Sequence, residues 1–311
     1  MKIWFLNVGH GDCTIIEHAS GRLTMIDINN SQDYDPATRQ EILAEQSGAT
    51  TLASFQAYAA METIETKELT DPVDFLTTNF PGRPLWRFIL THPDLDHMRG
   101  LKKLLNHVKI VNFWDTANTK PTPSYRSNSD QEDWECYQAI RSGGYQLSYL
   151  QYYRGAKAFA FGTDADGLGD GIEILSPTGQ LVQTCNEQGK SNDLSYVLRV
   201  TYAGRSVLLP GDAEALSWDL MVQHYGQALQ SRVLKASHHG RDSGFHAEAM
   251  KMIQPGLVVS SVGRKPATDA HSRYRNCGCT SISTRRHGNI LYQVDAFGNE
   301  GWTLQRNSHL L

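Results

Sequence analysis

The chain has 311 residues, of which 40% are hydrophobic, and this content is enough for a sizeable buried core. Twenty-nine Lys and Arg face 33 Asp and Glu, so the formal net charge of −4 argues against a protein that coats nucleic acid through general basicity. No apolar run approaches the ~20 residues of a membrane helix, and the N-terminus lacks the pattern of a signal peptide. We therefore expect a soluble, cytoplasmic protein that makes no membrane contact.

The five cysteines are too few, and odd in number, for a disulfide framework. Cys277-Gly-Cys279 could be a metal or redox pair, but no second pair accompanies it. We interpret these two residues as unrelated thiols in a reducing compartment.

The first third of the chain predicts antiparallel strands followed by an acidic segment. The strands are expected at 2–8, 13–18 and 23–28. Residues 31–84 contain nine acidic and three basic residues and predict helices at about 37–46 and 53–69, ended by Asp71-Pro72 and Pro81-Gly82. We interpret 31–84 as a helical insertion that could bind a basic partner, bind a second copy of the chain in a homodimer, or cover a site as a lid.

The middle of the chain combines one strong strand signal with long loops. An apolar strand at 86–91 runs into a polar cluster, and an amphipathic helix is expected at 98–108. Residues 115–171 read as loops with one helix at about 131–142, and loops of that length are often functional. The Asp-rich run 162–171 lacks the ligand spacing of a calcium loop, so we interpret it as a solvated turn.

The last third alternates strands and helices. Residues 194–202 and 206–209 predict a β-hairpin. Further elements are expected as helices at 214–228 and 245–253 and as strands at 232–236, 257–262, 290–294 and 301–304. The whole chain, 1–311, is therefore expected to form one α/β domain.

Potential metal ligands follow three of the predicted strands. Four lie within the six residues 92–97, one follows a Pro-Gly turn, and two are adjacent histidines. Because the carboxyl ends of buried strands meet at one edge of a layered fold, these groups can converge on a metal centre. The candidate ligands are His92, Asp94, Asp96, His97, Asp212, His238 and His239.

These motifs resemble the metallo-β-lactamase superfamily and, within it, the nuclease-like domain of ComEC-type DNA-internalisation proteins. The resemblance rests on FLNVGHGDCTII (5–16), LTMIDIN (23–29), FILTHPDLDHMRGL (88–101), NDLSYVLRVTYAGRSVLLPGDAE (192–214), VLKASHHG (233–240) and the region of His271. It implies a metallo-β-lactamase-like αββα four-layer sandwich, here with the acidic helical insertion.

The resemblance also implies roles for the metal ligands. His92 and Asp94 would help to hold one divalent ion, Asp96 and His97 the second, and Asp212 would bridge both. One of His238 and His239 would complete a coordination shell. Three carboxylates make the pocket harder than a His-rich zinc site, so Mn²⁺, or less favourably Mg²⁺, competes with Zn²⁺.

Further residues are expected around the ions. Asp12 and Asp27 could orient ligand imidazoles from behind, although Asp12 could equally be a turn residue. No His precedes Asp212 at the remaining ligand position of the family, which leaves one ion short of nitrogen ligands. Asn192 and Ser195 occupy that stretch and, with Lys235, are candidate substrate-binding residues.

A basic segment near the C-terminus completes the candidate site. Residues 264–287 carry six basic residues and one acidic residue, and such a segment beside an anionic metal pair suits a phosphate-bearing substrate. A solvated basic face is the alternative. His271 would contact the phosphate or act as the acid for the leaving group, and the substrate-binding candidates are Arg264, Lys265, Arg273, Arg285 and Arg286.

We therefore predict a metal-dependent hydrolase, in which hydroxide generated between two ions attacks a phosphodiester of DNA, RNA or a nucleotide in line. With Asp96, Asp212 and His271 at its catalytic centre, it would be a nuclease or phosphodiesterase. One alternative is a metallo-hydrolase of a lactone, amide or thioester. Another is a metal-binding partner protein that uses the acidic insertion as an interface.

Overall fold

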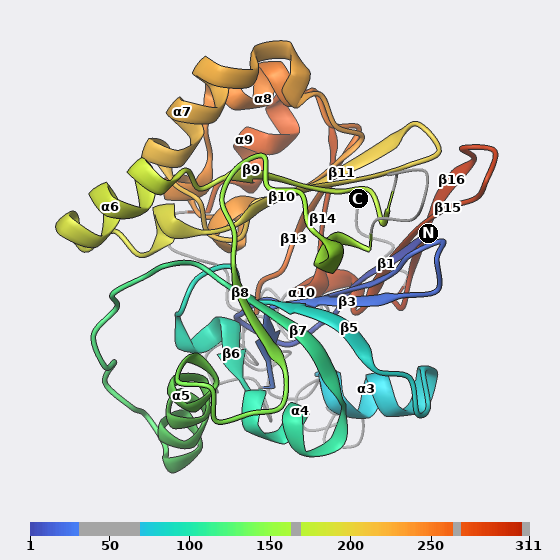
Figure 1. The fold of residues 1–311 in the computed structure, drawn as a ribbon. Helices are drawn as coiled ribbons and strands as arrows, with labels where there is room; N and C mark the ends of the chain where they lie inside the picture. The colour runs from blue at the N-terminus through green and yellow to red at the C-terminus, as the bar shows by residue number, and fades with distance from the viewer. Residues whose placement is uncertain (31–68, 163–168, 264–268, 307–311) are drawn as a thin grey trace, which may run out of the picture.

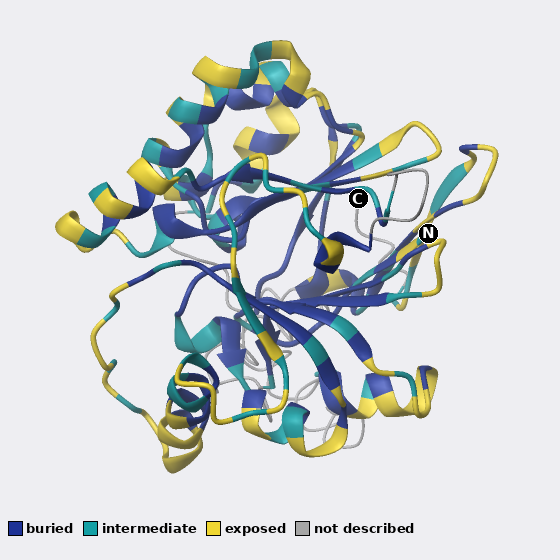
Figure 2. Cartoon of the chain, in the orientation of Figure 1, coloured by how far each residue is buried: buried dark blue, intermediate teal, exposed yellow. Residues whose placement is uncertain are grey.

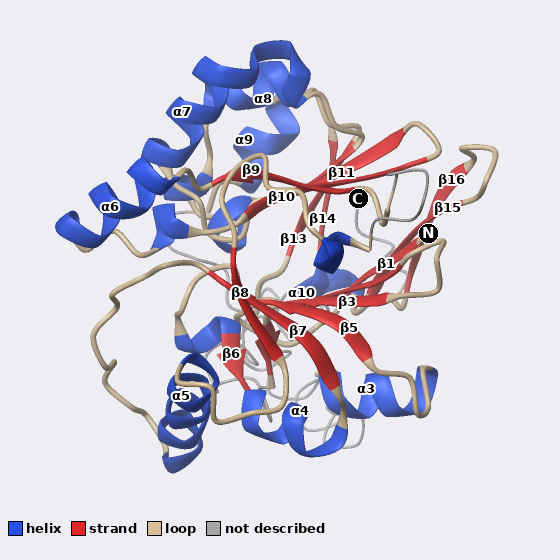
Figure 3. Cartoon of the chain, in the orientation of Figure 1, coloured by secondary structure: helices blue, strands red, loops and turns tan. Residues whose placement is uncertain are grey.

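The computed structural model describes residues 1–30, 69–162, 169–263 and 269–306. Two mixed β-sheets pack face to face, and helices cover the outer face of each (Figures 1 and 3). This is the αββα four-layer arrangement that the family resemblance implies, so the fold class is confirmed.

The eight-stranded sheet has the order β16-β15-β1-β2-β3-β5-β7-β8. Its antiparallel half ends at β3, and β5, β7 and β8 continue parallel to β3. Its strands are β1 (Lys2–Phe5), β2 (Thr14–Glu17), β3 (Leu23–Ile26), β5 (Leu85–Ile89), β7 (Ile110–Asp115), β8 (Ser148–Gln151), β15 (Ile290–Val294) and β16 (Glu300–Leu304).

The six-stranded sheet has the order β14-β13-β12-β11-β10-β9, in which β11 to β14 run parallel. The predicted hairpin is present as β10 and β11. The strands are β9 (Ile172–Ser176), β10 (Val197–Tyr202), β11 (Arg205–Leu209), β12 (Val233–Lys235), β13 (Leu257–Ser260) and β14 (Thr280–Ser283). A short parallel pair, β4 (Ile28–Asn29) with β6 (Met98–Arg99), lies beside the first sheet's strand ends.

Three apolar layers hold these elements together. The layer between the sheets includes Phe5, Ile89, Trp114 and Val259, and the sheets are accordingly the most continuously buried part of Figure 2. The outer layer of the eight-stranded sheet is covered by α3 (Pro72–Asn79), α4 (Leu101–His107) and α5 (Asn128–Arg141). That of the six-stranded sheet is covered by α7 (Ala215–Tyr225), α8 (Ala247–Ile253) and α9 (His271–Asn276), with α6 (Gly179–Gln188) in a smaller cluster and α10 (Thr284–His287) after β14.

The end of the acidic segment, residues 69–84, is the part that the structure describes, and it differs from its prediction. The helices expected at 37–46 and 53–69 fall outside the described residues, apart from position 69, which is not helical. Asp71-Pro72 starts a helix instead of ending one. The Asp71 carboxylate accepts hydrogen bonds from the Val73 and Asp74 amides, and Pro72 occupies the first turn of α3, where no backbone donor is needed.

Three other expectations are corrected. The helix predicted from Met98 starts at Leu101, because Met98–Arg99 pair with β4 and Gly100 takes a left-handed conformation with φ 92°. The region predicted as loops contains β8. Asp170, expected in a solvated turn, is buried and paired with Arg87 between the sheets.

The cysteine side chains make separate contacts. All five are free. The exposed Cys277 thiol lies against the carbonyl of Arg273, and the buried Cys279 thiol lies against that of Tyr274.

Candidate metal centre

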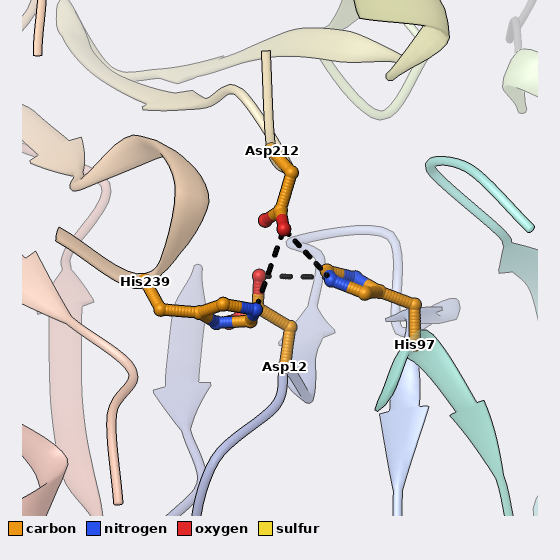
Figure 4. Close-up of side chains that lie close together, drawn as sticks. All are labelled: Asp12, His97, Asp212 and His239. Carbon is orange, nitrogen blue, oxygen red and sulfur yellow. Dashed lines mark ion pairs between the residues drawn. The ribbon is translucent and has the colours of Figure 1, made fainter. Parts of the chain in front are cut away.

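The potential ligands converge where strands of both sheets end. His92 to His97 follow β5, Asp212 follows β11, and His238 and His239 follow β12. The loop between β1 and β2 adds Asp12, and Asp27 follows β3. Figure 4 shows side chains of Asp12, His97, Asp212 and His239 meeting from these separate segments.

One carboxylate oxygen stands at the centre of this arrangement. Asp212 Oδ2 lies 3.3 Å from His97 Nε2 and 3.4 Å from His239 Nε2. It also lies 3.8 Å from His238 Nε2 and 4.0 Å from His92 Nε2. The rings follow one another around it, with neighbouring centroids 4.2 Å apart for His92 and His97, 5.2 Å for His97 and His239, and 6.0 Å for His239 and His238.

The sequence left open which of the two adjacent histidines faces the centre, and in the structure both do. His238 and His239 have φ values of 48° and 56°, in the left-handed region that non-glycine residues rarely adopt. These two successive left-handed residues bring the Nε2 atoms of consecutive side chains to the same carboxylate. His239 is buried, whereas His238 is 16% exposed and its Nδ1 lies 2.8 Å from both Glu214 Oε1 and Ser243 Oγ.

The other imidazoles are fixed through Nδ1, which leaves Nε2 directed at Asp212. His97 Nδ1 lies 2.8 Å from Asp27 Oδ2, and His239 Nδ1 lies 3.1 Å from the Ser261 carbonyl. His92 Nδ1 lies 3.2 Å from the Ser195 hydroxyl. The Nε2 atoms of these three histidines, and Asp212 Oδ1, are buried without a hydrogen bond of good geometry, as expected for atoms arranged to bind a cation.

The carboxylates divide the centre into two parts. His97 and His239 lie beside Asp212, and Asp96 Oδ2 lies 3.4 Å from His239 Nε2. We call Asp96, His97, His239 and Asp212 the inner group. At the other end, Asp94 Oδ1 lies 3.5 Å from His92 Nε2, and we call these two residues the outer pair. Lys120 contacts the same Asp94 oxygen.

Asp12 offers a possible ligand atom of its own, within 4.8 Å of those of His97, His239 and Asp212. Its oxygens approach the Nδ1 side of the rings, at 3.5 Å from His239 and 4.0 Å from His97, and Asp12 Oδ2 pairs with Lys235 at 2.5 Å. Asp27 accepts hydrogen bonds from the amide and hydroxyl of Thr91, both at 2.7 Å. Both carboxylates are therefore placed to orient imidazoles.

The buried histidines and carboxylates of the centre shift one another's pKa values. Burial opposes ionisation, but His239 and His97 hold the pKa of Asp212 well below its ordinary value. In turn, Asp212 holds the pKa values of both imidazoles well above normal despite their burial. Burial also opposes ionisation of Asp12, yet Lys235 and His239 lower its pKa to about 2. Without metal the inner group therefore holds protons that a divalent ion would displace.

The candidate substrate-binding residues Ser195, Lys235 and Asn192 differ in what they contact. Ser195 is buried and also accepts a hydrogen bond from the Asp212 amide, and Lys235 is 3% exposed, so both contact candidate ligands and not solvent. Asn192 Nδ2 donates to Glu214 Oε1 at 3.3 Å.

The structure describes only part of the basic segment 264–287. Arg264 and Lys265 lie outside the described residues. Arg285 is buried and donates to the Gly263 carbonyl, Arg273 pairs with Asp242 and lies over the Phe245 ring, and Arg286 is exposed. His271 begins α9 with its Nδ1 3.0 Å from Ser281 Oγ. It belongs to neither of the two possible ligand clusters found among the described residues, one of Asp12, His97, Asp212 and His239 and the other of His10, Asp96 and His239.

Sequence reasoning missed two residues beside the centre. His10 lies with Asp96 and His239 in a second possible ligand cluster, and its Nε2 is 3.1 Å from Arg241 Nη2. Burial and the nearby His239 lower its pKa to about 4. Its place within the GHGD motif was the available signal; Lys120 lies in a loop without any motif.

The fold of the chain is similar to that of a known metallo hydrolase. Igni18, a metallo hydrolase from the archaeon Ignicoccus hospitalis, superposes with a TM-score of 0.50 at 12% identity, covering 95% of this chain and 100% of that one. No family model matches the sequence.

The resemblance that the sequence motifs suggested is confirmed at low identity. The chain is 25% identical over 182 residues to Competence protein ComA of Neisseria gonorrhoeae, and 24% identical over 179 residues to ComE operon protein 3 of Bacillus subtilis. The matches cover 56% and 57% of this chain but 25% and 20% of those proteins, so the chain corresponds to a minor part of each. Among the described residues, none of the helices is both long and apolar enough to cross a lipid bilayer.

Proposed function

We propose that the protein is a metal-dependent phosphodiesterase that cleaves nucleic acid or a nucleotide. The observation that carries the proposal is the convergence of four imidazole Nε2 atoms within 4.0 Å of Asp212 Oδ2. The buried Nε2 atoms, which make no hydrogen bond of good geometry, and the mixture of imidazole and carboxylate donors fit Zn²⁺ or Mn²⁺.

The inner group would hold one ion, and the outer pair would help to hold a second that shares Asp212. When bound, divalent ions act as Lewis acids on a phosphoryl group and lower the pKa of a water molecule. Asp27 and Ser195 hold the rings of His97 and His92 in position. Asp12, itself paired with Lys235, lies beside His97 and His239.

The phosphodiester preference is supported by cations beside the centre and by the resemblance to competence proteins. Lys120 contacts Asp94, and Arg241 lies against His10. Cations in these positions can neutralise the charge that grows on phosphate oxygens during in-line displacement. His271 and the exposed Arg273 and Arg286 stay candidate substrate contacts.

The test is a cleavage assay of the metal-stripped protein reloaded with Zn²⁺, Mn²⁺ or Mg²⁺. Substrates are single- and double-stranded DNA, RNA, a cyclic dinucleotide, a lactone and a thioester. We expect metal-dependent cleavage of a phosphodiester, which Asp212→Ala lowers by about a hundredfold or more, whereas Asp74→Ala at an exposed position of α3 leaves it unchanged.

Two results would contradict the proposal. Hydrolysis of only the lactone or thioester would favour the small-molecule alternative. Metal binding with no turnover of any substrate would favour a binding protein.

A further inference from the structure

The more exposed side chains of the candidate metal centre, which we call its mouth, are acidic. The Asp94, Asp96 and Glu214 side chains are each 30% exposed, whereas those of His92, His97, His239 and Asp212 are at most 4% exposed. A phosphate that approaches the ligands must therefore pass carboxylates, and it needs a cation close by.

Lys120 places a cation at this mouth. Its ammonium contacts Asp94 Oδ1, the oxygen that faces His92 Nε2 at 3.5 Å, and its side chain is 19% exposed. The ammonium therefore binds the outer pair. Apart from the shared Asp212, this pair offers an ion only one imidazole and one carboxylate as ligands. The inner group offers two imidazoles and one carboxylate.

The segment that carries Lys120 is anchored on both sides. The Thr119 amide donates to Asn186 Oδ1 on α6 at 3.0 Å, and Asn186 Nδ2 donates back to the Ala117 carbonyl at 2.9 Å. From α5, Arg141 donates to the Asn118 carbonyl at 2.8 Å. Lys120 thus projects from a fixed backbone, as expected for a residue with a defined target.

We propose that Lys120 is a substrate-binding residue that competes with a second metal ion for Asp94 and presents its ammonium to the substrate phosphate at the mouth of the centre. This inference deepens the proposed function and rests on it for the phosphate. The competition itself depends only on the contacts of Lys120 and Asp94. A single Asp94 oxygen cannot serve the ammonium and a second ion equally well, so each weakens the binding of the other.

The test compares the metal-stripped wild type with Lys120→Met, Lys120→Arg and the control variant Lys102→Met. The Lys102 side chain lies on α4 and is 46% exposed. Mn²⁺ is titrated and followed by calorimetry and by the electron paramagnetic resonance of the free ion. We expect a tight first ion in all four proteins and a second ion that binds Lys120→Met about tenfold or more tightly than wild type. Lys120→Arg and Lys102→Met should behave as the wild type does.

Inorganic phosphate is then titrated into each protein loaded with Mn²⁺. We expect Lys120→Met to bind phosphate about tenfold more weakly than the wild type and the control. Equal affinity for the second ion in wild type and Lys120→Met would overturn the competition, and equal phosphate affinity would overturn the substrate contact. Neither titration requires turnover. A protein that cleaves no phosphodiester would refute the proposed function, and the two titrations would still decide whether Lys120 competes with the second ion and binds phosphate.

Discussion

His238 and His239 show how single residues shape the centre. A left-handed conformation costs a non-glycine residue about 1–3 kcal/mol, and two occur here in succession. The surrounding contacts keep both: Glu214 and Ser243 hold His238, and the Ser261 carbonyl holds His239. Backbone strain is thus maintained where it turns two side chains toward Asp212.

Asp27 gives the first prediction at this scale. Its Oδ2 fixes Nδ1 of His97 and also accepts from the Thr91 hydroxyl, so Asp27→Asn weakens the orientation and basicity of the ring. We expect Zn²⁺ affinity to fall about 10- to 100-fold, measured by competition with a chromogenic chelator. Asp74→Asn on the surface is the control, and an unchanged affinity in Asp27→Asn would contradict the orienting role.

Sequence alone identifies the residues of the centre that belong to local motifs. His92 to His97, Asp212 and the two adjacent histidines all follow strong strand signals. The supporting contacts could not be read in the same way, because Lys235 reaches Asp12 and Ser195 reaches His92 across more than a hundred positions. Such pairs depend on how the two sheets pack.

At the scale of elements, a buried ion pair joins β5 to the segment before β9. Arg87 and Asp170 contact each other with both side chains fully buried, and Arg87 also donates to Thr24 and to the Ala160 carbonyl. Arg87→Met leaves the Asp170 charge without its main partner. We expect it to lower the free energy of unfolding by about 3–5 kcal/mol in urea denaturation.

The matched control for this pair is Lys251→Met, which removes the exposed partner of Glu248 on α8. It should change the free energy of unfolding by less than about 1 kcal/mol. A similar decrease in the free energy of unfolding in both variants would show that the buried Arg87–Asp170 pair contributes no more to stability than an exposed ion pair.

Asp115 at the end of β7 gives a pH dependence. Burial raises its pKa to about 6, although Tyr137 and Tyr149 donate hydrogen bonds to it. The folded state therefore favours the protonated form, and stability falls as pH rises from about 4 to about 6, by about 3 kcal/mol for this group. In Asp115→Asn this part of the pH dependence is absent.

The measurement is urea denaturation of both proteins at pH 4 and pH 7. The stability of Asp115→Asn relative to wild type should rise by about 3 kcal/mol between these values. A constant difference would mean that Asp115 ionises in the folded protein as readily as in the unfolded chain.

The elements themselves were predictable where burial is strong. The strand at β5 and the β10–β11 hairpin carry continuous apolar signals and were expected. The edge strand β8, with sequence SYLQ, is only partly buried, so no apolar pattern marks it. Pro72 was predicted to end a helix but begins one, because proline occurs both at the first turn of a helix and just after its end.

At the scale of the whole molecule, the metal centre connects the two sheets. The inner group draws Asp96 and His97 from the end of β5, and Asp212 and His239 from the ends of β11 and β12. An ion held by residues from both sheets would stabilise the folded chain over the unfolded one. The single-domain assignment and the role of 31–84 stay predictions at this scale.

Metal removal should therefore lower thermal stability. Binding at a hundredfold excess over Kd contributes about 2.7 kcal/mol, so stripping the ion with a chelator should lower Tm by several degrees. Differential scanning calorimetry checks this, and adding Zn²⁺ or Mn²⁺ back should restore Tm. An Asp212→Ala protein should show no such difference, and a wild-type Tm indifferent to chelator would contradict a metal that links the sheets.

The most direct test of the account is the metal content of the purified protein, determined by elemental analysis beside Asp212→Ala and the surface variant Asp74→Ala. The account predicts at least one equivalent of Zn²⁺ or Mn²⁺ in the wild type and in Asp74→Ala, and its loss from Asp212→Ala with the fold retained. A wild-type protein that binds no divalent ion, even after incubation with Zn²⁺ and Mn²⁺, would contradict the metal centre and the hydrolase derived from it.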